Sequence, residues 1–415
     1  MPEKVMIIAV KKPDQQADKF RSSLDEVESL VRTAGGEVKY VATQNRMRIH
    51  PALYIGEGKA KEIKNIAIEM EIDLVVSNDE LSAGQSRNLS DLLGVRLIDR
   101  SQLILDIFAQ RARTREGKLQ VELAQLAYLL PRLRGQGTQL SRLGGGIGTR
   151  GPGETKLETD QRHIRQRMDE IKRRLKSAVK QRGQYRNRRK SNDTFQIAIV
   201  GYTNAGKSTL FNRLTNSLSL EENQLFATLD PLTRKLDLPS GFQALVTDTV
   251  GFIQDLPTSL IAAFRSTLEE VKEADFVLHV VDSSHPNQLQ QQQTVKKLLH
   301  ELDADTIPVL TVYNKKDLLE EEVISFAHPY IVISAWSDDG IQMLKQKIET
   351  ELKMLWQPYE IYLPAENGSV IHHLRRKSII VTNFFDENQE KYLINGYIKD
   401  DNVLQSVLKG VKEKQ

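Results

Sequence analysis

The chain has no cysteine and no run close to the ~20 apolar residues that cross a membrane. The first absence excludes a disulfide framework, a thiolate zinc site and thiol chemistry, and it fits a reducing compartment. Met1-Pro-Glu-Lys4 leads directly into a short apolar segment, so no signal peptide is expected. We therefore expect a cytoplasmic protein without a membrane span. A monomeric state is a separate expectation.

The net charge of the chain is also small, at +3 over 415 residues. The distribution is uneven. Residues 156–190 hold fourteen Lys or Arg against four Asp or Glu, a balance of +10, so the rest of the chain sums to −7. A basic tract of this density on a helix is typical of a nucleic-acid contact. The plainer interpretation is a solvated helix face.

A phosphate-binding loop is present at residues 201–208, whose sequence fits G-x-x-x-x-G-K-[ST]. The apolar run Phe195–Val200 before it indicates a buried strand, and Ser208–Leu214 has helical spacing. Backbone N–H groups and the helix N-terminus would face the phosphates. Lys207 would reach the β- and γ-phosphates, and Ser208 would bind magnesium. The expected nucleotide contacts are Gly201, Tyr202, Thr203, Asn204, Ala205, Gly206, Lys207 and Ser208.

Guanine rather than adenine is indicated by an N-K-x-D segment directly after the apolar run Ile307–Tyr313. The carboxylate of Asp317 can accept hydrogen bonds from the guanine N1–H and 2-amino groups. Adenine lacks this pair of donors, so a buried carboxylate would stay unpaired against it. After the run Tyr330–Ser334, a backbone N–H can meet the guanine O6. The expected base contacts are Asn314, Lys315, Lys316, Asp317, Ser334, Ala335 and Trp336.

Two segments between these motifs have the features of nucleotide-dependent switches. The D-x-x-G segment follows the run Gln243–Thr247, with Asp248 near the magnesium and the Gly251 N–H near the γ-phosphate. Upstream, Thr228 is the expected second magnesium ligand beside Ser208. Thr233 competes, and we prefer Thr228 because it stands on the loop side of the strand-like segment that follows, residues 234–238. The switch residues are Phe226, Ala227, Thr228, Leu229, Asp230, Asp248, Thr249, Val250 and Gly251.

The glutamine that orients the attacking water in many GTPases is missing, because Phe252 follows Gly251. Gln254 lies two residues further on, and nothing places it, so no catalytic residue is assigned. We expect slow intrinsic hydrolysis, about 10⁻⁴ to 10⁻² per second, and acceleration by a partner. Asn204 resembles the asparagine that holds a monovalent cation in potassium-activated GTPases. Magnesium is the expected cofactor, and potassium is a further hypothesis.

The fold class expected is α/β. A P-loop GTPase domain with a mostly parallel, doubly wound sheet follows a small α/β domain and a long helical hairpin, and precedes a small α+β domain. In the first domain, Lys4–Val10 and Glu37–Thr43 read as strands around the helix Ala17–Thr33. The predicted boundaries are 1–110 for the N-terminal domain, 111–191 for the hairpin, 192–355 for the GTPase domain and 356–415 for the C-terminal domain.

The hairpin is predicted from two heptad-like stripes, Leu119 to Leu133 and Leu157 to Ala178. Between them, residues 134–155 hold eight of the 24 glycines. A flexible basic tip on a rigid arm suits the irregular backbone of RNA, although a linker without function is the alternative. The RNA-binding candidates are Arg134, Arg142, Arg150 and Lys156.

The tract 144–162, with its Gly-Thr-Arg-Gly-Pro-Gly-Glu-Thr, closely resembles the HflX family of ribosome-associated GTPases, as do 201–209 and 248–252. The resemblance extends to Tyr54–Lys59 and Phe226–Asp230. It implies a cytoplasmic GTPase that binds the large ribosomal subunit, splits or rescues stalled ribosomes, and is stimulated by the ribosome. An assembly factor for the large subunit remains an alternative. An RNA-modifying enzyme would need a second catalytic constellation, and no such constellation stands out in the sequence.

Overall fold

The structure is a computed structural model, and its packing divides the chain into two compact units. Unit 1 contains residues 1–180, 223–230 and 254–265, and unit 2 contains residues 181–222, 231–253 and 266–415. This division follows packing, and the four domains expected from the sequence stay a prediction. The structure describes residues 2–133, 156–191, 194–216, 225–226, 228–253, 270–319, 328–364, 366, 368–387 and 390–399.

Unit 1 is built on a four-stranded sheet of order β2-β1-β3-β4, in which every pair is parallel. The parallel sheet expected from the alternation of strands and helices is therefore confirmed. Strand β1 is buried along most of its length, as expected when helices cover both faces of a parallel sheet. The elements are β1 (Lys4–Lys11), α1 (Ala17–Thr33), β2 (Glu37–Asn45), α2 (Glu57–Glu69), β3 (Leu74–Ser77), α3 (Ala83–Leu93) and β4 (Arg96–Asp99).

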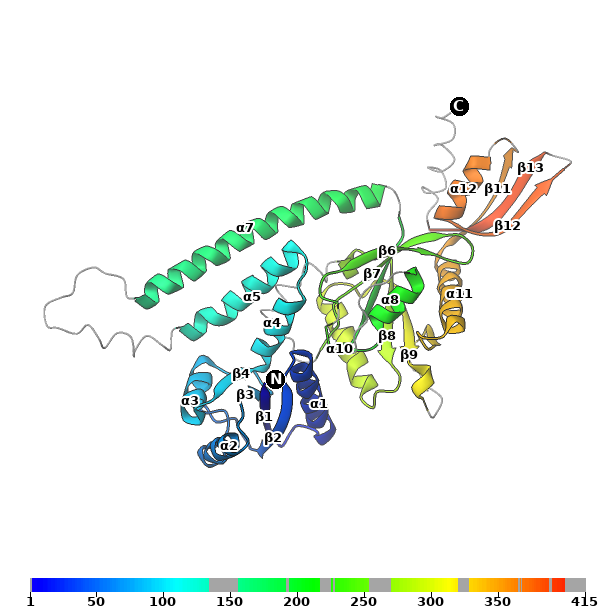
Figure 1. The fold of residues 1–415 in the computed structure, drawn as a ribbon. Helices are drawn as coiled ribbons and strands as arrows, with labels where there is room; N and C mark the ends of the chain where they lie inside the picture. The colour runs from blue at the N-terminus through cyan, green and yellow to red at the C-terminus, as the bar shows by residue number, and fades with distance from the viewer. Residues whose placement is uncertain are drawn as a thin grey trace. The chain divides into compact units, whose positions relative to one another are not determined.

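In the part of the chain that the structure describes, three helices follow this sheet: α4 (Arg100–Arg111), α5 (Arg115–Leu133) and α7 (Lys156–Ser191). Helix α5 and the part of α7 that belongs to unit 1, up to Lys180, run side by side (Figure 1). Between them, Arg167 donates two hydrogen bonds to the carboxylate of Glu122, at 2.7 and 3.0 Å. The apolar stripe of α7 is its least exposed side, and Ile171 on it is fully buried. This pairing is the helical arm that the two stripes predict.

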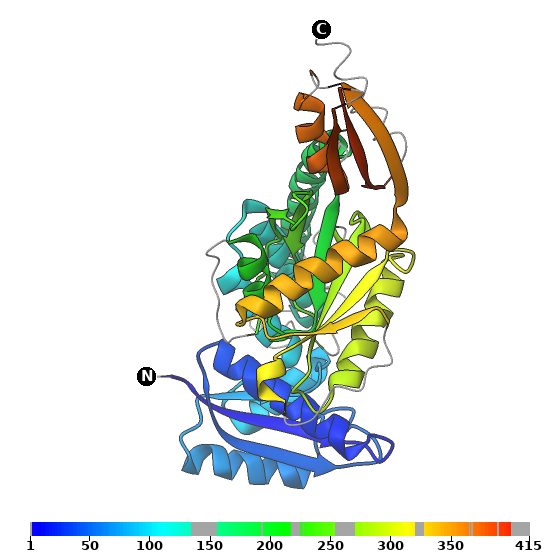
Figure 2. The ribbon, with the colours of Figure 1, turned by 90° about the vertical axis from the view of Figure 1, so that its right-hand side faces the viewer.

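Unit 2 contains a six-stranded sheet of order β10-β9-β8-β5-β7-β6, parallel except for the edge strand β6. Its core joins apolar residues of α8 and α11 to one sheet face, and Figure 2 shows α11 in orange crossing that face. The mostly parallel, doubly wound sheet is confirmed. The elements are β5 (Gln196–Gly201), α8 (Lys207–Thr215), β6 (Leu232–Asp237), β7 (Gln243–Asp248), β8 (Phe276–Asp282), α10 (Gln288–Glu301), β9 (Val309–Asn314), η2 (Lys316–Leu318), β10 (Tyr330–Val332) and α11 (Asp338–Leu355).

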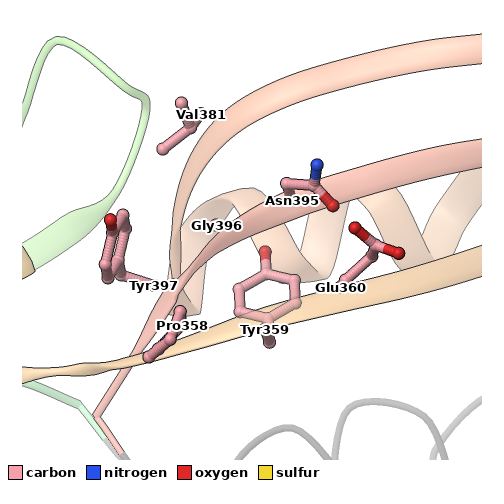
Figure 3. A pocket seen from close by; sticks show the side chains of 7 residues that line it. All are labelled: Pro358, Tyr359, Glu360, Val381, Asn395, Gly396 and Tyr397. Atoms are coloured by element: carbon pink, nitrogen blue, oxygen red, sulfur yellow. The ribbon is translucent and has the colours of Figure 1, made fainter.

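The end of unit 2 is an antiparallel sheet of order β11-β13-β12 with helix α12 on one face. Its strands and helix agree with the small α+β domain expected from the sequence. A hollow of about 370 Å³ lies beside β13, and its lining residues include Tyr359 and Asn395 (Figure 3). None of the expected nucleotide contacts lines it. The elements are β11 (Gln357–Pro364), α12 (Gly368–Lys377), β12 (Ile379–Asp386) and β13 (Lys391–Ile398).

Within the described part of the chain, every helix is either too short or too polar to cross a membrane.

Candidate functional site

The phosphate loop lies where the sequence places it, between the end of β5 at Gly201 and the start of α8 at Lys207. Three residues of the loop have a positive φ: Gly201 with 154°, Asn204 with 61° and Gly206 with 90°. At Gly206 a side chain is also excluded by space, because a Cβ there would collide with the amide nitrogen of Asn314. Only glycine satisfies both conditions, so the second glycine of the motif is structurally required.

Lys207 is buried at the base of this loop, with 6% of its surface exposed. Its ammonium donates a hydrogen bond to the backbone oxygen of Tyr202 at 2.7 Å. Burial lowers the pKa of Lys207 to about 8, and the negative charge of Asp248 opposes that shift only in part. A phosphate group beside the ammonium would favour its charged form and raise the pKa again.

Nucleotide affinity should therefore fall as the pH rises above 8. In the free protein Lys207 is charged below its pKa of about 8 and neutral above it, whereas bound phosphates keep it charged. By linkage, the Lys207 titration changes the affinity for GDP little between pH 7 and 7.5 and makes it roughly tenfold weaker at pH 9 than at pH 7. Fluorescence titration with a labelled GDP across this range tests the prediction. A profile that bends only at the higher pH where guanine N1 loses its proton would contradict it.

The groups around Lys207 fit a magnesium-bound nucleotide. The hydroxyl of Ser208 donates to a carboxylate oxygen of Asp248 at 2.9 Å, so two oxygen ligands of the kind that Mg²⁺ prefers lie together. The buried hydroxyl of Thr203 has no hydrogen-bond partner among the described residues, which suits a polar ligand. No cluster of three or more His, Cys, Asp or Glu occurs in the described ranges. A P-loop site needs none, because magnesium there is bound by phosphate oxygens and retained waters together with only one or two protein oxygens.

The D-x-x-G segment closes against the phosphate loop through backbone hydrogen bonds. Thr203 N–H donates to the oxygen of Phe252 at 2.8 Å, and Phe252 N–H donates to the oxygen of Gly201 at 3.1 Å. A Cβ on Gly251 would lie 2.9 Å from the Lys207 ammonium, so the glycine leaves space at that point. The side chain of Phe252 is 1% exposed, and it has no polar atom to orient a water. Gln254 lies outside the described residues.

Asn314 joins three of the predicted motifs through one side chain, which is 2% exposed. Its amide nitrogen donates to the oxygen of Ala205 in the phosphate loop at 3.0 Å. Its amide oxygen accepts from the N–H of Ala335 at 2.8 Å. The asparagine of N-K-x-D therefore connects the phosphate loop to the segment 334–336, and the expected phosphate and base contacts share one support.

The remaining base residues lie around the short helix η2. Asp317 on η2 is exposed, although a buried carboxylate was expected. Its carboxylate can be shielded from water only when the bound base covers it. Trp336 is 68% exposed beside the buried Ala335. Lys315, with φ 64°, extends its ammonium to the carboxylate of Asp282 at 2.6 Å.

Sequence reasoning missed Asp282 and Ser283. The N–H of Ser283 donates to the oxygen of Asn314 at 3.0 Å, so both residues support the N-K-x-D segment from the neighbouring strand. A signal was available, because they stand at the carboxyl end of the apolar run that forms β8. In a parallel sheet these ends meet at the binding edge.

The upstream switch segment belongs to unit 1, whereas the phosphate loop and the D-x-x-G segment belong to unit 2. Thr228 and Asp230 are described, and Ala227 lies outside the described residues. The competitor Thr233 lies on β6, and its hydroxyl is 3.0 Å from the hydroxyl of Thr247 on β7. The expectation that Thr228 joins Ser208 on one magnesium stays a prediction.

The RNA-binding candidates are not placed by the structure. Arg134, Arg142 and Arg150 lie outside the described residues. Lys156 is the first residue of α7, and its side chain is not described. The described basic residues of α7 are mostly exposed, among them Arg165, Arg173 and Lys176.

Three family models match consecutive parts of the chain. Residues 21–109 match "GTP-binding GTPase N-terminal", and residues 111–189 match "GTP-binding GTPase Middle Region". Residues 196–315 match "50S ribosome-binding GTPase".

Curated relatives match over most of the chain. A "GTPase HflX" of Alkalihalophilus pseudofirmus is 54% identical over 397 residues, which covers 95% of this chain and 94% of the relative. A "GTPase HflX" of Caldanaerobacter subterraneus is 49% identical, with 92% and 88% covered. The "GTPase HflX" of Escherichia coli is 43% identical, with 89% and 88% covered.

Proposed function

Because the chain belongs to the HflX family of GTPases, we propose that it works on the large ribosomal subunit and splits or rescues stalled ribosomes. The chain is a GTPase: it binds GTP and GDP and hydrolyses GTP to GDP and phosphate. In the proposed cycle the GTP-bound protein binds the large subunit and separates it from the small one. Hydrolysis then releases the protein.

The observation that carries this proposal is the buried Phe252 directly after Gly251. A site without its own water-orienting side chain at that position depends on a partner for fast hydrolysis. The matched family model is described as ribosome-binding, which supports the ribosome as that partner. The exposed basic side chains of α7 support RNA as the contacted surface.

Five residues of the site have proposed roles in binding the nucleotide and its cations. Magnesium, the general cofactor of GTPases, neutralises charge on the phosphates when it is bound, and Ser208 and Thr228 would hold it. Lys207 would bind the β- and γ-phosphates, and Asp317 would bind the guanine edge. The exposed Asn204 would help to hold a potassium ion beside the phosphates.

The test is GTP hydrolysis by the full chain in potassium buffer, with and without purified large ribosomal subunits. We expect the subunits to stimulate hydrolysis tenfold or more. A Lys207→Ala protein reports any GTPase that contaminates the subunits, and sodium in place of potassium tests the role of Asn204. Intact GDP binding without stimulation would contradict the proposal.

A role in subunit assembly is the second candidate, and the same basic surface supports it. Sedimentation separates the two. Splitting predicts that whole ribosomes become subunits when the protein and a non-hydrolysable GTP analogue are added. Assembly predicts binding to immature subunits while whole ribosomes stay intact.

A further inference from the structure

The switch segment around Thr228 is held by helix α5, through the carboxylate of Asp230. This carboxylate accepts hydrogen bonds from the backbone N–H of Arg113 at 3.0 Å and of Thr114 at 2.8 Å. It also accepts one from the hydroxyl of Thr114, at 2.5 Å. Three donors therefore converge on one side chain at the residues that precede α5.

The first turn of helix α5 leaves space for this carboxylate and favours its negative charge. The hydroxyl of Thr114 accepts a hydrogen bond from the N–H of Gly117 at 2.9 Å, which is a helix N-cap. A Cβ at Gly117 would collide with a carboxylate oxygen of Asp230. The positive end of the helix dipole also favours a negative charge at this place. Gly117 thus permits a contact that any larger residue would block.

A second set of contacts holds the segment on the other side of Thr228. The ring of Phe226 packs edge to face on Phe108 of α4, with 4.5 Å between the ring centroids. The N–H of Leu225 donates to the hydroxyl of Thr33 at the end of α1, at 3.2 Å. Leu225 and Phe226 are both buried. Thr228 therefore lies between two fixed points, and Thr33, Phe108 and Thr114, which hold them, belong to unit 1.

We propose that Asp230 is a positioning residue for GTP: its contact with the N-terminus of α5 holds Thr228 ready to bind magnesium. The proposal rests on the assignment of Thr228 as a magnesium ligand. A segment held in advance loses less conformational entropy when it binds, so the contact increases affinity. GDP lacks the γ-phosphate that orders such segments. The contact should therefore strengthen the binding of GTP and leave that of GDP unchanged.

This linkage is reciprocal, because two coupled equilibria change one another by the same factor. If the α5 contact favours GTP, then GTP must favour the α5 contact. The amide hydrogens of Arg113 and Thr114 should exchange more slowly with a GTP analogue bound than with GDP bound. Since α5 is one helix of the arm, its first turn reports the nucleotide state to that arm.

The first test compares Asp230→Ala with the unchanged protein, using the dissociation constants of a non-hydrolysable GTP analogue and of GDP in magnesium buffer. We expect Asp230→Ala to weaken analogue binding about tenfold and to leave GDP binding unchanged. Asp230→Asn should restore most of the loss, because its amide oxygen can still accept from both backbone N–H groups. Asp73→Ala is the matched control, since the carboxylate of Asp73 accepts a hydrogen bond from the backbone N–H of Lys4 elsewhere in unit 1.

The second test disrupts the same contact by a substitution in helix α5. Gly117→Ala should displace the carboxylate of Asp230 without a substitution in the switch segment itself, and it should weaken analogue binding by a similar factor. Unchanged GDP binding shows in each variant that the site is folded. If both variants leave the ratio of analogue to GDP affinity unchanged, or raise it, the proposal is wrong. Thr228→Ala tests the premise that Thr228 binds magnesium. An unchanged ratio of analogue to GDP affinity in this variant would reject that assignment. Stimulation by the ribosome is measured independently, so the proposed function is tested separately.

Discussion

Asp317→Asn is expected to lower the preference for GTP over ATP by a factor of about a thousand. The carboxylate of Asp317 would accept hydrogen bonds from both the N1–H and the 2-amino group of guanine. An asparagine presents one acceptor and one donor, so its NH₂ group meets the guanine amino group as a second donor. The loss falls on guanine nucleotides alone, because the phosphate loop is unchanged.

The measurement is competition of GTP, ATP and XTP against a labelled GDP. Xanthine carries an oxygen where guanine carries the 2-amino group, so Asp317→Asn should gain affinity for XTP as it loses affinity for GTP. Asp339→Asn is the matched control, because Asp339 is also exposed and lies on the neighbouring helix α11. An unchanged selectivity between GTP and ATP in Asp317→Asn would show that Asp317 does not make the assigned contact with the base.

Asn314→Ala is expected to weaken the binding of GTP and GDP alike, by about a hundredfold. The change leaves the oxygen of Ala205 and the N–H of Ala335 without the amide that joins them. Each unpaired buried group costs about 1–3 kcal/mol. The two segments carry the expected phosphate and base contacts, so both parts of the nucleotide lose their support.

Isothermal titration with GDP measures this effect, and thermal unfolding without nucleotide shows how much of it is lost stability. Asn383→Ala serves as control, since Asn383 is exposed on β12. Asn314→Asp adds a finer comparison. It keeps an acceptor for the N–H of Ala335 but places a second acceptor against the oxygen of Ala205, so it should bind weakly too. Normal GDP affinity in Asn314→Ala would show that the two segments are supported independently.

Many of the strands and helices and the motif loops were predictable from the sequence, because local patterns encode them, but helices α3, α4, α10 and α11 were not among the expected elements. The run Phe195–Val200, the glycine spacing after it and the helical spacing of 208–214 are all local signals, and they correspond to β5, the phosphate loop and α8. Helix α1 begins and ends at the predicted residues, Ala17 and Thr33. The parallel order of the sheets follows from the alternation of strands and helices.

The contacts between distant segments were not predictable in this way. The amide of Asn314 bonds to residues 109 and 21 positions away, and nothing in the local pattern of N-K-x-D specifies them. The bonds of Asp230 to Arg113 and Thr114 span more than a hundred residues. Such pairs depend on how sheets and helices pack, and a single sequence records only the residue types that take part.

The order in which the chain enters the two units limits how the protein can be shortened. Residues 223–230 pack with unit 1, although the chain before and after them belongs to unit 2. A shortened protein that begins after α7 would keep Phe226 and Asp230 but lose Phe108, Thr114 and Gly117. A buried ring would then face water, which promotes aggregation. Removal of the first 191 residues therefore yields an altered GTPase, and its hydrolysis rate would not report the intrinsic rate of the intact enzyme.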